Sequence, residues 1–262
     1  MVSKEIVLSI SNLSKTFEGP LGTKKNLFED INLSLVAGQF KSLLAPQGSG
    51  KTTLLRIIAG LEKANSGEVD ITDTNPNPIK TAFIPSRPSS LPWFNVEKNI
   101  EYILNLISKN KDTKNIKELI NIVGLTGYEK HYAHNKSVGF RFRISLARAL
   151  AANPKIILID EPLNNLDFES KKEIYHLLND IHVKMDIAFL FATSNISEAV
   201  FLSDFILVLQ KNPIKILKEI EVNLPPNRRI EIFQDELFDK IRSDVIQVYK
   251  SESDYSLHSL TI

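Results

Sequence analysis

The sequence has no cysteine among its 262 residues. This absence excludes disulfide bonds and thiolate metal sites, and it fits a reducing compartment. The sequence also lacks any uncharged apolar run near the roughly 18 residues that a membrane-spanning helix requires. Its opening residues, MVSKEIVLSI, lack the apolar core of a signal peptide. We therefore expect no secretion signal, and we expect any role at a membrane to be peripheral.

A charge excess is missing as well. Lys plus Arg number 32 and Asp plus Glu number 31, so the formal net charge is +1. A balanced charge produces no overall field that favours nucleic acid or an anionic membrane surface. We accordingly predict no nucleic-acid partner. A chain of this length is enough for one large domain, or for a core with a small subdomain.

The first third of the chain alternates apolar and polar residues. Alternation predicts half-buried strands, and it is found at residues 6–10, 31–35 and 67–71. A loop with two Asn-Pro pairs follows at 72–80. The apolar spacing then becomes helical, which predicts helices near 100–107, 116–123 and 143–152.

The second half of the chain contains apolar runs that are separated by helices. The runs lie at 156–159, 187–191 and 205–209, with helical stretches at 168–182 and 195–202 between them. Apolar strands that alternate with helices predict an α/β fold with a parallel sheet covered on both faces. The tail carries one further amphipathic helix, at about 231–249. That helix can pack on its own core, contact a partner or bind a regulator.

Residues 45–61, APQGSGKTTLLRIIAGL, place a Gly-rich loop between an apolar strand at 40–44 and an apolar helix. In such a loop the backbone N–H groups point at a phosphate, and glycine lets the phosphate approach. The alternative is a Gly-Ser turn that happens to precede a helix, but the strand, the spacing and the helix together favour the phosphate loop. The predicted nucleotide-binding residues here are Ala45, Pro46, Gln47, Gly48, Ser49, Gly50, Lys51, Thr52 and Thr53.

Ala45 stands where the pattern of a phosphate loop usually has glycine. We expect the alanine to be tolerated because it lies at the strand exit, whereas Gly48 and Gly50 stand where phosphate must approach. Within the loop, Lys51 can span the β- and γ-phosphates, and the Thr52 hydroxyl can ligate Mg²⁺.

Two carboxylates end the apolar run at 156–159, namely Asp160 and Glu161. Coupled to a phosphate loop, Asp160 is expected to hold Mg²⁺ and Glu161 to polarise an attacking water as general base. Two acids at a strand end also occur by chance, and only the phosphate loop gives them this meaning. We predict Glu161 and Lys51 as catalytic residues, and Thr52 and Asp160 as Mg²⁺ ligands.

The order of these segments resembles the ATP-binding cassette (ABC) ATPases over essentially the whole chain. After the phosphate loop come Leu91-Pro92-Trp93, RISLARAL at 143–150, IILIDEP at 156–162 and TSNISEAVFLSD at 193–204. The Leu-Pro-Trp stretch and the tail LPPNR at 224–228 look most like the cassettes of nitrate, sulfonate and taurine-type importers.

This resemblance implies a RecA-like P-loop NTPase core with an N-terminal antiparallel β-subdomain and an inserted helical subdomain. The ATPase domain would cover residues 1–222, with the helical subdomain at about 87–150, and the C-terminal tail would cover 223–262. The implied cofactors are ATP and Mg²⁺. The implied partners are an integral membrane permease, a second cassette in a homodimer or heterodimer, and a solute-binding protein. The implied location is peripheral, on the cytoplasmic face of the cell membrane.

The resemblance also implies site residues outside the phosphate loop. Phe17 would stack on adenine, although it is equally an ordinary strand-end aromatic. Ser137 and Gly139 would offer a hydroxyl and a backbone N–H to the γ-phosphate of a partner cassette. Trp93 is either a permease contact or a loop aromatic.

Several positions depart from the family pattern. The glutamine expected near Mg²⁺ and the attacking water is Ser86, which is too short to reach the same point without a bridging water. The signature Leu-Ser-Gly-Gly-Gln aligns with 136–140, where Val138 adds bulk and Phe140 removes an amide. The histidine that contacts the γ-phosphate is Ser194. Losing one well-placed transition-state donor costs about 3 kcal/mol.

Three functions therefore compete. The first is the ATP-binding subunit of an importer, which couples ATP binding and hydrolysis to transport of a small solute. The second is a catalytically weak cassette that serves a complete partner as a structural or regulatory subunit, which the departures favour. A soluble cassette of translation or DNA repair is the third, but the sequence shows one cassette, no long coiled-coil insert and a balanced charge.

Overall fold

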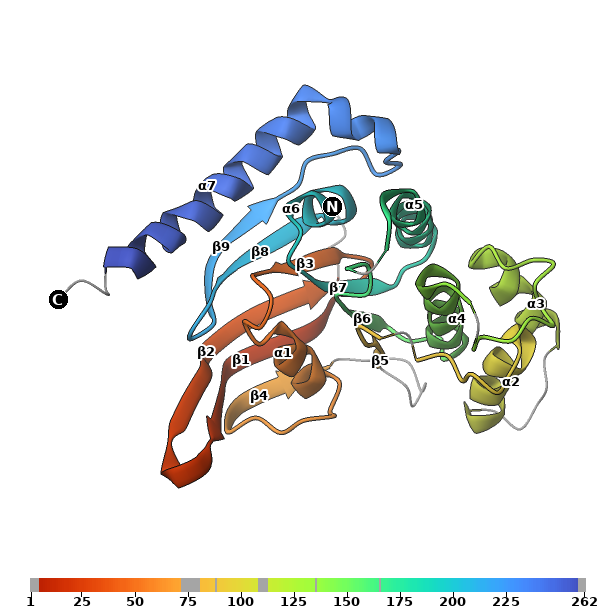
Figure 1. Cartoon of the computed structure of the whole chain (residues 1–262), viewed down its shortest axis with the longest axis horizontal. Coiled ribbons are helices and arrows are strands. Elements are labelled where there is room, and N and C mark those ends of the chain that lie inside the picture. Colours follow the sequence, from red (N-terminus) through yellow and green to blue (C-terminus); the bar gives the residue numbers. More distant parts are fainter. Residues whose placement is uncertain are drawn as a thin grey trace.

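The computed structural model describes residues 5–71, 81–87, 89–107, 113–134, 136–164 and 166–258, which fold around two β-sheets (Figure 1). The larger sheet has six strands in the order β5-β6-β7-β3-β8-β9. Neighbouring strands are parallel except β9, which is antiparallel to β8. The strands are β3 (Phe40–Leu44), β5 (Thr81–Ile84), β6 (Ile156–Asp160), β7 (Ala188–Thr193), β8 (Phe205–Gln210) and β9 (Lys215–Glu221).

The central strands of this sheet are buried on both faces. Every residue of β3, β6 and β7 is buried, which explains why β6 and β7 appear in the sequence as largely apolar runs. The parallel sheet predicted from those runs is confirmed. Strand β9 was not predicted, because it is a partly exposed edge strand with only a weak apolar alternation.

The smaller sheet is antiparallel and has the order β2-β1-β4, from β1 (Ile6–Glu18), β2 (Lys24–Val36) and β4 (Ser66–Asp70). The predicted strands at 6–10 and 31–35 lie within β1 and β2, which are longer and are joined by a 3₁₀ turn, Pro20–Gly22. Cross-strand pairs such as Leu13 with Ile31 place the apolar residues on one face. The antiparallel β-subdomain expected at the N-terminus is therefore present. The loop predicted at 72–80 lies outside the described residues.

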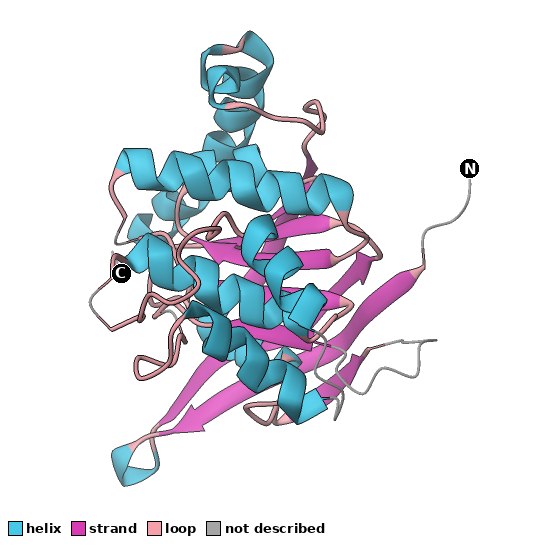
Figure 2. Ribbon diagram, turned by 90° about the vertical axis from the view of Figure 1, so that its right-hand side faces the viewer, coloured by secondary structure: helices cyan, strands magenta, loops and turns pink. Residues whose placement is uncertain are grey.

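Helices cover both faces of the larger sheet. On one face α1 (Lys51–Ile58) and the antiparallel sheet share a core with Leu158 and Leu190. On the opposite face the intervening strand residues Ile157 and Phe189 pack with a second layer of helices. Figure 2 shows helices in front of the strands. That layer contains α4 (Val138–Ala151), α5 (Phe168–Lys184), α6 (Ile196–Leu202) and α7 (Glu236–His258). The molecule is thus a three-layer α/β fold.

A helical region stands to one side of the sheets. It consists of α2 (Val96–Ile107), α3 (Thr113–Ile122) and α4, which lie together at the right of Figure 1. Helix α4 begins at Val138 and not at the predicted residue 143. The reason is that the Ser137 hydroxyl accepts the N–H of Phe140 at 3.2 Å, so an N-cap starts the helix within a segment predicted to be a loop.

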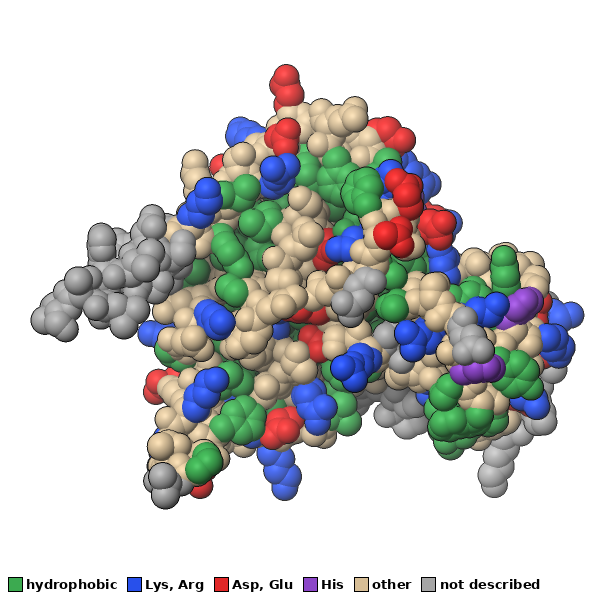
Figure 3. All heavy atoms as spheres, viewed as in Figure 1, with side chains coloured by type: hydrophobic (Ala, Val, Ile, Leu, Met, Phe, Trp, Pro, Cys, Tyr) green, Lys and Arg blue, Asp and Glu red, His purple; other side chains and the backbone are tan. Residues whose placement is uncertain are grey.

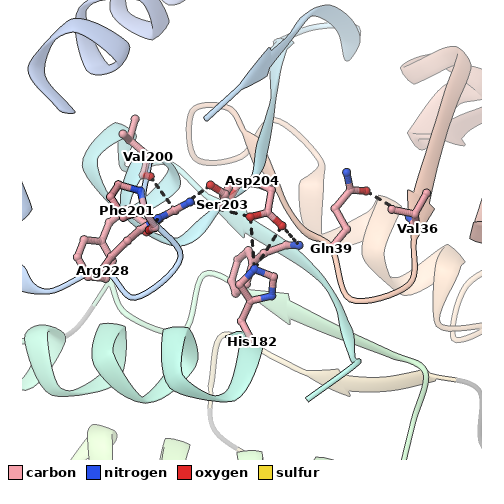
Figure 4. Close-up of polar contacts among 11 residues, drawn as sticks. Val36, Gln39, His182, Val200, Phe201, Ser203, Asp204 and Arg228 are labelled. Atoms are coloured by element: carbon pink, nitrogen blue, oxygen red, sulfur yellow. Dashed lines mark hydrogen bonds and ion pairs between the residues drawn. The ribbon is translucent and has the colours of Figure 1, made fainter. Parts of the chain in front are cut away.

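The segment after β9 is fastened to the core by a buried arginine (Figure 4). The Arg228 guanidinium donates to the carbonyl oxygens of Val200, Phe201 and Ser203, at 3.3, 2.7 and 2.8 Å. These carbonyls close the C-terminal end of α6, where a helix leaves acceptors without intrahelical donors. Burial lowers the pKa of Arg228 to about 10, against the opposing effect of the nearby Asp204 carboxylate.

Asp204 connects this fastening to the sheet. Its carboxylate accepts the Phe40 N–H at 2.9 Å and lies 3.3 Å from His182 Nε2. Burial acts to raise the pKa of Asp204, but the hydrogen bonds from His182 and Phe40 and the charge of Arg228 hold it below its ordinary value. The cluster therefore ties the start of β3, the end of α5 and the tail together.

The C-terminal helix packs on the core of its own chain. It begins at Glu236, after a 3₁₀ turn (Ile230–Gln234), and ends at His258, so it lies later in the chain than the predicted 231–249. Phe238, Ile241 and Val245 are buried against the same core as α6. Burial and, secondarily, the charge of Glu161 raise the pKa of Tyr249.

Candidate nucleotide site

The predicted phosphate loop connects β3 to α1. Gly48 and Gly50 have φ angles of +69° and +115°, which L side chains adopt with strain. A Cβ on Gly50 would also lie 2.7 Å from Leu27 Cδ1, so the loop needs glycine there for both reasons. Ala45 is fully buried at the strand exit and is not among the positive-φ residues. Alanine at that position therefore costs the loop no backbone strain.

Lys51 lies under this loop and is only 3% exposed. Its ammonium donates to the carbonyl oxygens of Ala45 at 2.7 Å and Pro46 at 3.0 Å. It also forms an ion pair with Glu161 Oε1 at 2.6 Å. Since an ammonium has three donors, all three have partners within the chain.

Thr52 and Asp160 meet at the opposite side of the loop. The Thr52 hydroxyl lies 3.0 and 2.9 Å from the two Asp160 carboxylate oxygens. Burial raises the pKa of Asp160, and the charge of Glu161 acts in the same direction, against the Thr52 hydrogen bond and the charge of Lys51. A buried carboxylate of this kind is stabilised by a cation.

Glu161 follows directly with an unusual backbone. Its φ angle is +40°, and its N–H donates to Ala192 O at 3.0 Å, which continues the hydrogen bonding between β6 and β7. The Asn164 side chain donates to Glu161 Oε2 at 2.6 Å. Asn164 was not singled out from the sequence. Only its position three residues after a predicted general base could have drawn attention to it.

These residues surround one open cavity of about 300 Å³, which is lined by Leu27, Gly48, Gly50, Lys51, Thr52, Thr53, Ser86, Asp160 and Glu161. The first N–H groups of α1 have no intrahelical partner and face an anion in such an arrangement. The Ser49 hydroxyl is buried and has no hydrogen-bond partner among the described residues. The cradle therefore fits a polyphosphate that supplies the missing acceptors.

The oxygen ligands fit Mg²⁺. The described residues contain no group of three or more His, Cys, Asp or Glu side chains that could enclose a metal ion. Mg²⁺ is normally held by one or two protein oxygens, with phosphates and waters completing an octahedron. The hydroxyl of Thr52 and the carboxylate of Asp160 are two protein oxygens suited to this kind of coordination.

Phe17 lies near this cavity but does not line it. Its side chain is 40% exposed, and the Lys15 ammonium sits 4.8 Å from the ring centroid. Phe17 pairs with Lys25 on β2, two positions before Leu27, which does line the cavity. Two residues of a strand span about 7 Å. An adenine extending from the cavity would therefore find this ring within reach.

The residues predicted to sense a γ-phosphate are more dispersed. Ser86 is exposed and lines the cavity. Ser194 is half-buried at the end of β7 and is not among the lining residues. Ser137 and Gly139 lie at the start of α4, also away from the cavity, and a Cβ on Gly139 would lie 3.8 Å from Leu166 Cδ2. In one chain the structure thus brings together the residues predicted to bind phosphate and metal, but not the predicted signature residues.

The comparisons with known proteins agree with this geometry. A family model described as ABC transporter matches residues 28–164. The aliphatic sulfonates import ATP-binding protein SsuB of Bacillus cereus is 37% identical over 94% of this chain and 96% of its own. The nitrate import ATP-binding protein NrtD of Synechocystis is 32% identical over 91% of this chain and 93% of its own.

Among solved structures, the dimeric post-hydrolysis state of the ATP-binding cassette MJ0796 bound to ADP and Pi has a TM-score of 0.71. It is 26% identical and covers 83% of this chain and all of that one. An inward-facing, putative metal-chelate type ABC transporter is 24% identical with a TM-score of 0.70, which supports the fold. On the family match, the relatives and the phosphate cradle together, this chain belongs to the ABC transporter family and is an ATPase domain of that family.

Proposed function

We propose that this chain is the ATP-binding and ATP-hydrolysing subunit of an importer, coupling hydrolysis to transport of a small solute. The observation that carries the proposal is the convergence of the α1 N-terminus, Lys51, Thr52, Asp160 and Glu161 on one cavity. Relatives named as import ATP-binding proteins support the direction of transport.

The residues around the cavity have different roles in the proposed hydrolysis, according to where they lie. The N–H groups from Gly48 to Thr53 bind the phosphates, and Lys51 leaves Glu161 to contact them. Thr52 and Asp160 hold Mg²⁺, which supplies neutralisation of phosphate charge when it is bound. Glu161, released from Lys51, accepts a proton from the attacking water. Phe17 places the base by stacking on its ring.

The exposed helical region supports docking to a permease. Trp93 is 65% exposed and contacts Phe94, which in turn contacts Tyr102, with ring centroids 6.3 and 6.0 Å apart. Exposed clusters of this kind mark interaction surfaces. The described residues contain no helix that is long and apolar enough to cross a bilayer. Relatives named as import ATP-binding proteins support a peripheral place for the chain, on the cytoplasmic side of a membrane permease.

The remaining partners follow from the site. Ser137 and Gly139 lie away from the cavity, so they serve the nucleotide of a second cassette, in a homodimer or a heterodimer. A solute-binding protein would deliver the substrate to the permease. The visible face in Figure 3 intersperses Lys and Arg with Asp and Glu side chains, which supports protein partners in preference to nucleic acid.

The test is the ATPase rate at saturating ATP for the wild type and for Glu161→Gln. We expect the variant to lose roughly 10²–10⁴-fold in kcat while keeping ATP–Mg²⁺ affinity, because the amide replaces only the proton acceptor. Affinity purification from membranes is expected to recover an integral membrane protein with the chain. A wild-type rate no higher than that of the variant would instead leave the catalytically weak cassette as the function.

A further inference from the structure

Both oxygens of the Glu161 carboxylate have a partner in this structure. Oε1 pairs with the Lys51 ammonium at 2.6 Å, and Oε2 accepts the Asn164 side-chain amide at 2.6 Å. The two partners differ in charge. An ammonium neutralises a carboxylate, whereas a neutral amide orients the carboxylate and leaves its charge in place.

The turn that carries Asn164 is fixed at both ends. Leu163 is fully buried on the core side. Asp167 caps α5 by accepting the Ser170 N–H at 2.9 Å. At the other end Glu161 is held by its backbone bond to Ala192. The backbone on either side of the exposed Asn164 is therefore held in place, and its side-chain amide is bonded to Glu161.

The Lys51 contact cannot persist once phosphate is bound. All three donors of its ammonium already have partners, so a phosphate oxygen must displace one of them. The two carbonyl partners belong to the loop that itself grips the phosphates. The Glu161 contact is the one that a phosphate, with its higher charge, replaces. Oε1 then becomes free, while Oε2 keeps the Asn164 amide.

We propose that Asn164 is a positioning residue for Glu161: its amide holds Oε2 so that the released Oε1 faces the attacking water. The inference rests on the proposed ATPase function. Asn164 touches neither nucleotide nor metal in this arrangement, so it acts only through the Glu161 carboxylate.

The experiment compares steady-state ATP hydrolysis and ATP–Mg²⁺ binding for Asn164→Ala, Asn164→Asp and Asn164→Gln. We expect Asn164→Ala to lower kcat roughly tenfold or more, because small displacements of a reacting group cost that much. The KM and the ATP dissociation constant should stay within about twofold. Asn164→Asp should lower kcat further, because a like charge then faces Glu161. Asn164→Gln keeps an amide and should recover part of the loss.

The matched control is Asn26→Ala. Asn26 donates to Glu29 Oε2 at 3.3 Å, with the same spacing of three residues, but on the exposed part of β2. We expect no change in kcat for this variant. The decisive comparison adds Asn164→Ala to Glu161→Gln and follows a single turnover. Because Asn164 acts through the carboxylate, the second substitution should leave the residual rate unchanged.

Three results would overturn the inference: an unchanged kcat in Asn164→Ala, a KM that rises in step with the loss, or a further tenfold loss in the Glu161→Gln background. These results are distinguishable from failure of the proposed function, because they arise with an active wild type. A wild-type chain that hydrolyses no ATP would contradict both the proposed ATPase function and the role of Asn164.

Discussion

The cavity at the end of β3 and the three serines predicted to sense a γ-phosphate differ in what holds their side chains. Lys51 and Asp160 are 3% and 2% exposed, and their polar atoms are paired within the chain. Ser86 and Ser194 are exposed or half-buried, at loops beyond strand ends. Lys51 and Asp160 are thus held by partners inside the chain, whereas the side chains of Ser86 and Ser194 are more open to solvent.

The departures from the family pattern at Ser86 and Ser194 fall on the less enclosed of these two groups. Replacing Lys51 would remove the donor to two backbone carbonyl oxygens and the ion-pair partner of Glu161 inside the folded chain. Replacing a residue that meets the γ-phosphate changes only the assembled, nucleotide-bound state. Ser137 is intermediate, because its hydroxyl also caps α4 by accepting the N–H of Phe140. Departures can therefore accumulate at the sensing positions without cost to the fold.

The largest effect is expected from Lys51→Ala. Removing a charged donor to phosphate should weaken ATP–Mg²⁺ binding roughly a hundredfold, and hydrolysis should be lost with it. Equilibrium titration with ATP measures the change. Lys218→Ala, on the exposed strand β9, is the matched control and should bind as the wild type does. A near-normal ATP affinity in Lys51→Ala would contradict the prediction that the cavity residues contribute more to ATP binding than the three serines do.

A gain of function tests the sensing positions. Ser194→His supplies an imidazole near the γ-phosphate, and we expect kcat to rise about tenfold, which is part of what one donor contributes. The gain should be partial because Ser86 remains short, and adding Ser86→Gln should increase it. Ser66→His, on the exposed part of β4, should change nothing. No gain in the chain alone or with its partners would contradict the assignment of Ser194.

A smaller effect is expected at the predicted adenine platform. Phe17→Ala should raise the KM for ATP about fivefold with little change in kcat, because stacking contributes about 1 kcal/mol to binding. Phe17→Tyr keeps a ring and should restore the wild-type KM. If Phe17→Ala and the wild type share one KM, Phe17 is only an exposed residue at a strand end.

The smallest effect concerns stability without nucleotide. The pKa of Asp160 is raised chiefly by burial, so the folded chain favours the protonated form. As the pH rises from the pKa of Asp160 in the unfolded chain through its higher pKa in the folded chain, ionisation of Asp160 lowers the free energy of unfolding. Asp160→Asn should raise the melting temperature at neutral pH. The two chains should melt alike at a pH where Asp160 is protonated.

Magnesium and ATP should reverse the order of the two melting temperatures, so that the wild type melts above Asp160→Asn. The carboxylate that costs stability in the empty chain is the one proposed to hold Mg²⁺ with Thr52. Added ATP–Mg²⁺ should therefore raise the melting temperature of the wild type more than that of Asp160→Asn. Thermal unfolding with and without ligand measures both effects. An equal shift in the two chains would remove Asp160 from the metal site.

Much of the cavity was predictable because its signals are local. The spacing from Gly48 to Thr52, and the pair Asp160-Glu161 after an apolar run, are contiguous in the sequence. The pairing of Glu161 with Asn164 was not predicted, because it depends on the conformation of the turn after β6, which no local pattern indicates. The early start of α4 was missed because a single cap at Ser137 outweighs the polar character of the segment.

The sequence by itself determined the alternation of strands and helices, the phosphate loop and the identity of its acidic partners. Periodicity and glycine placement act over a few residues, so each is visible without the fold. Only the tertiary structure decided that Thr52 meets Asp160 across 108 residues, that Lys51 rests on Glu161, and that α7 packs on its own core. Those outcomes depend on which distant surfaces bury one another, and no local pattern contains that information.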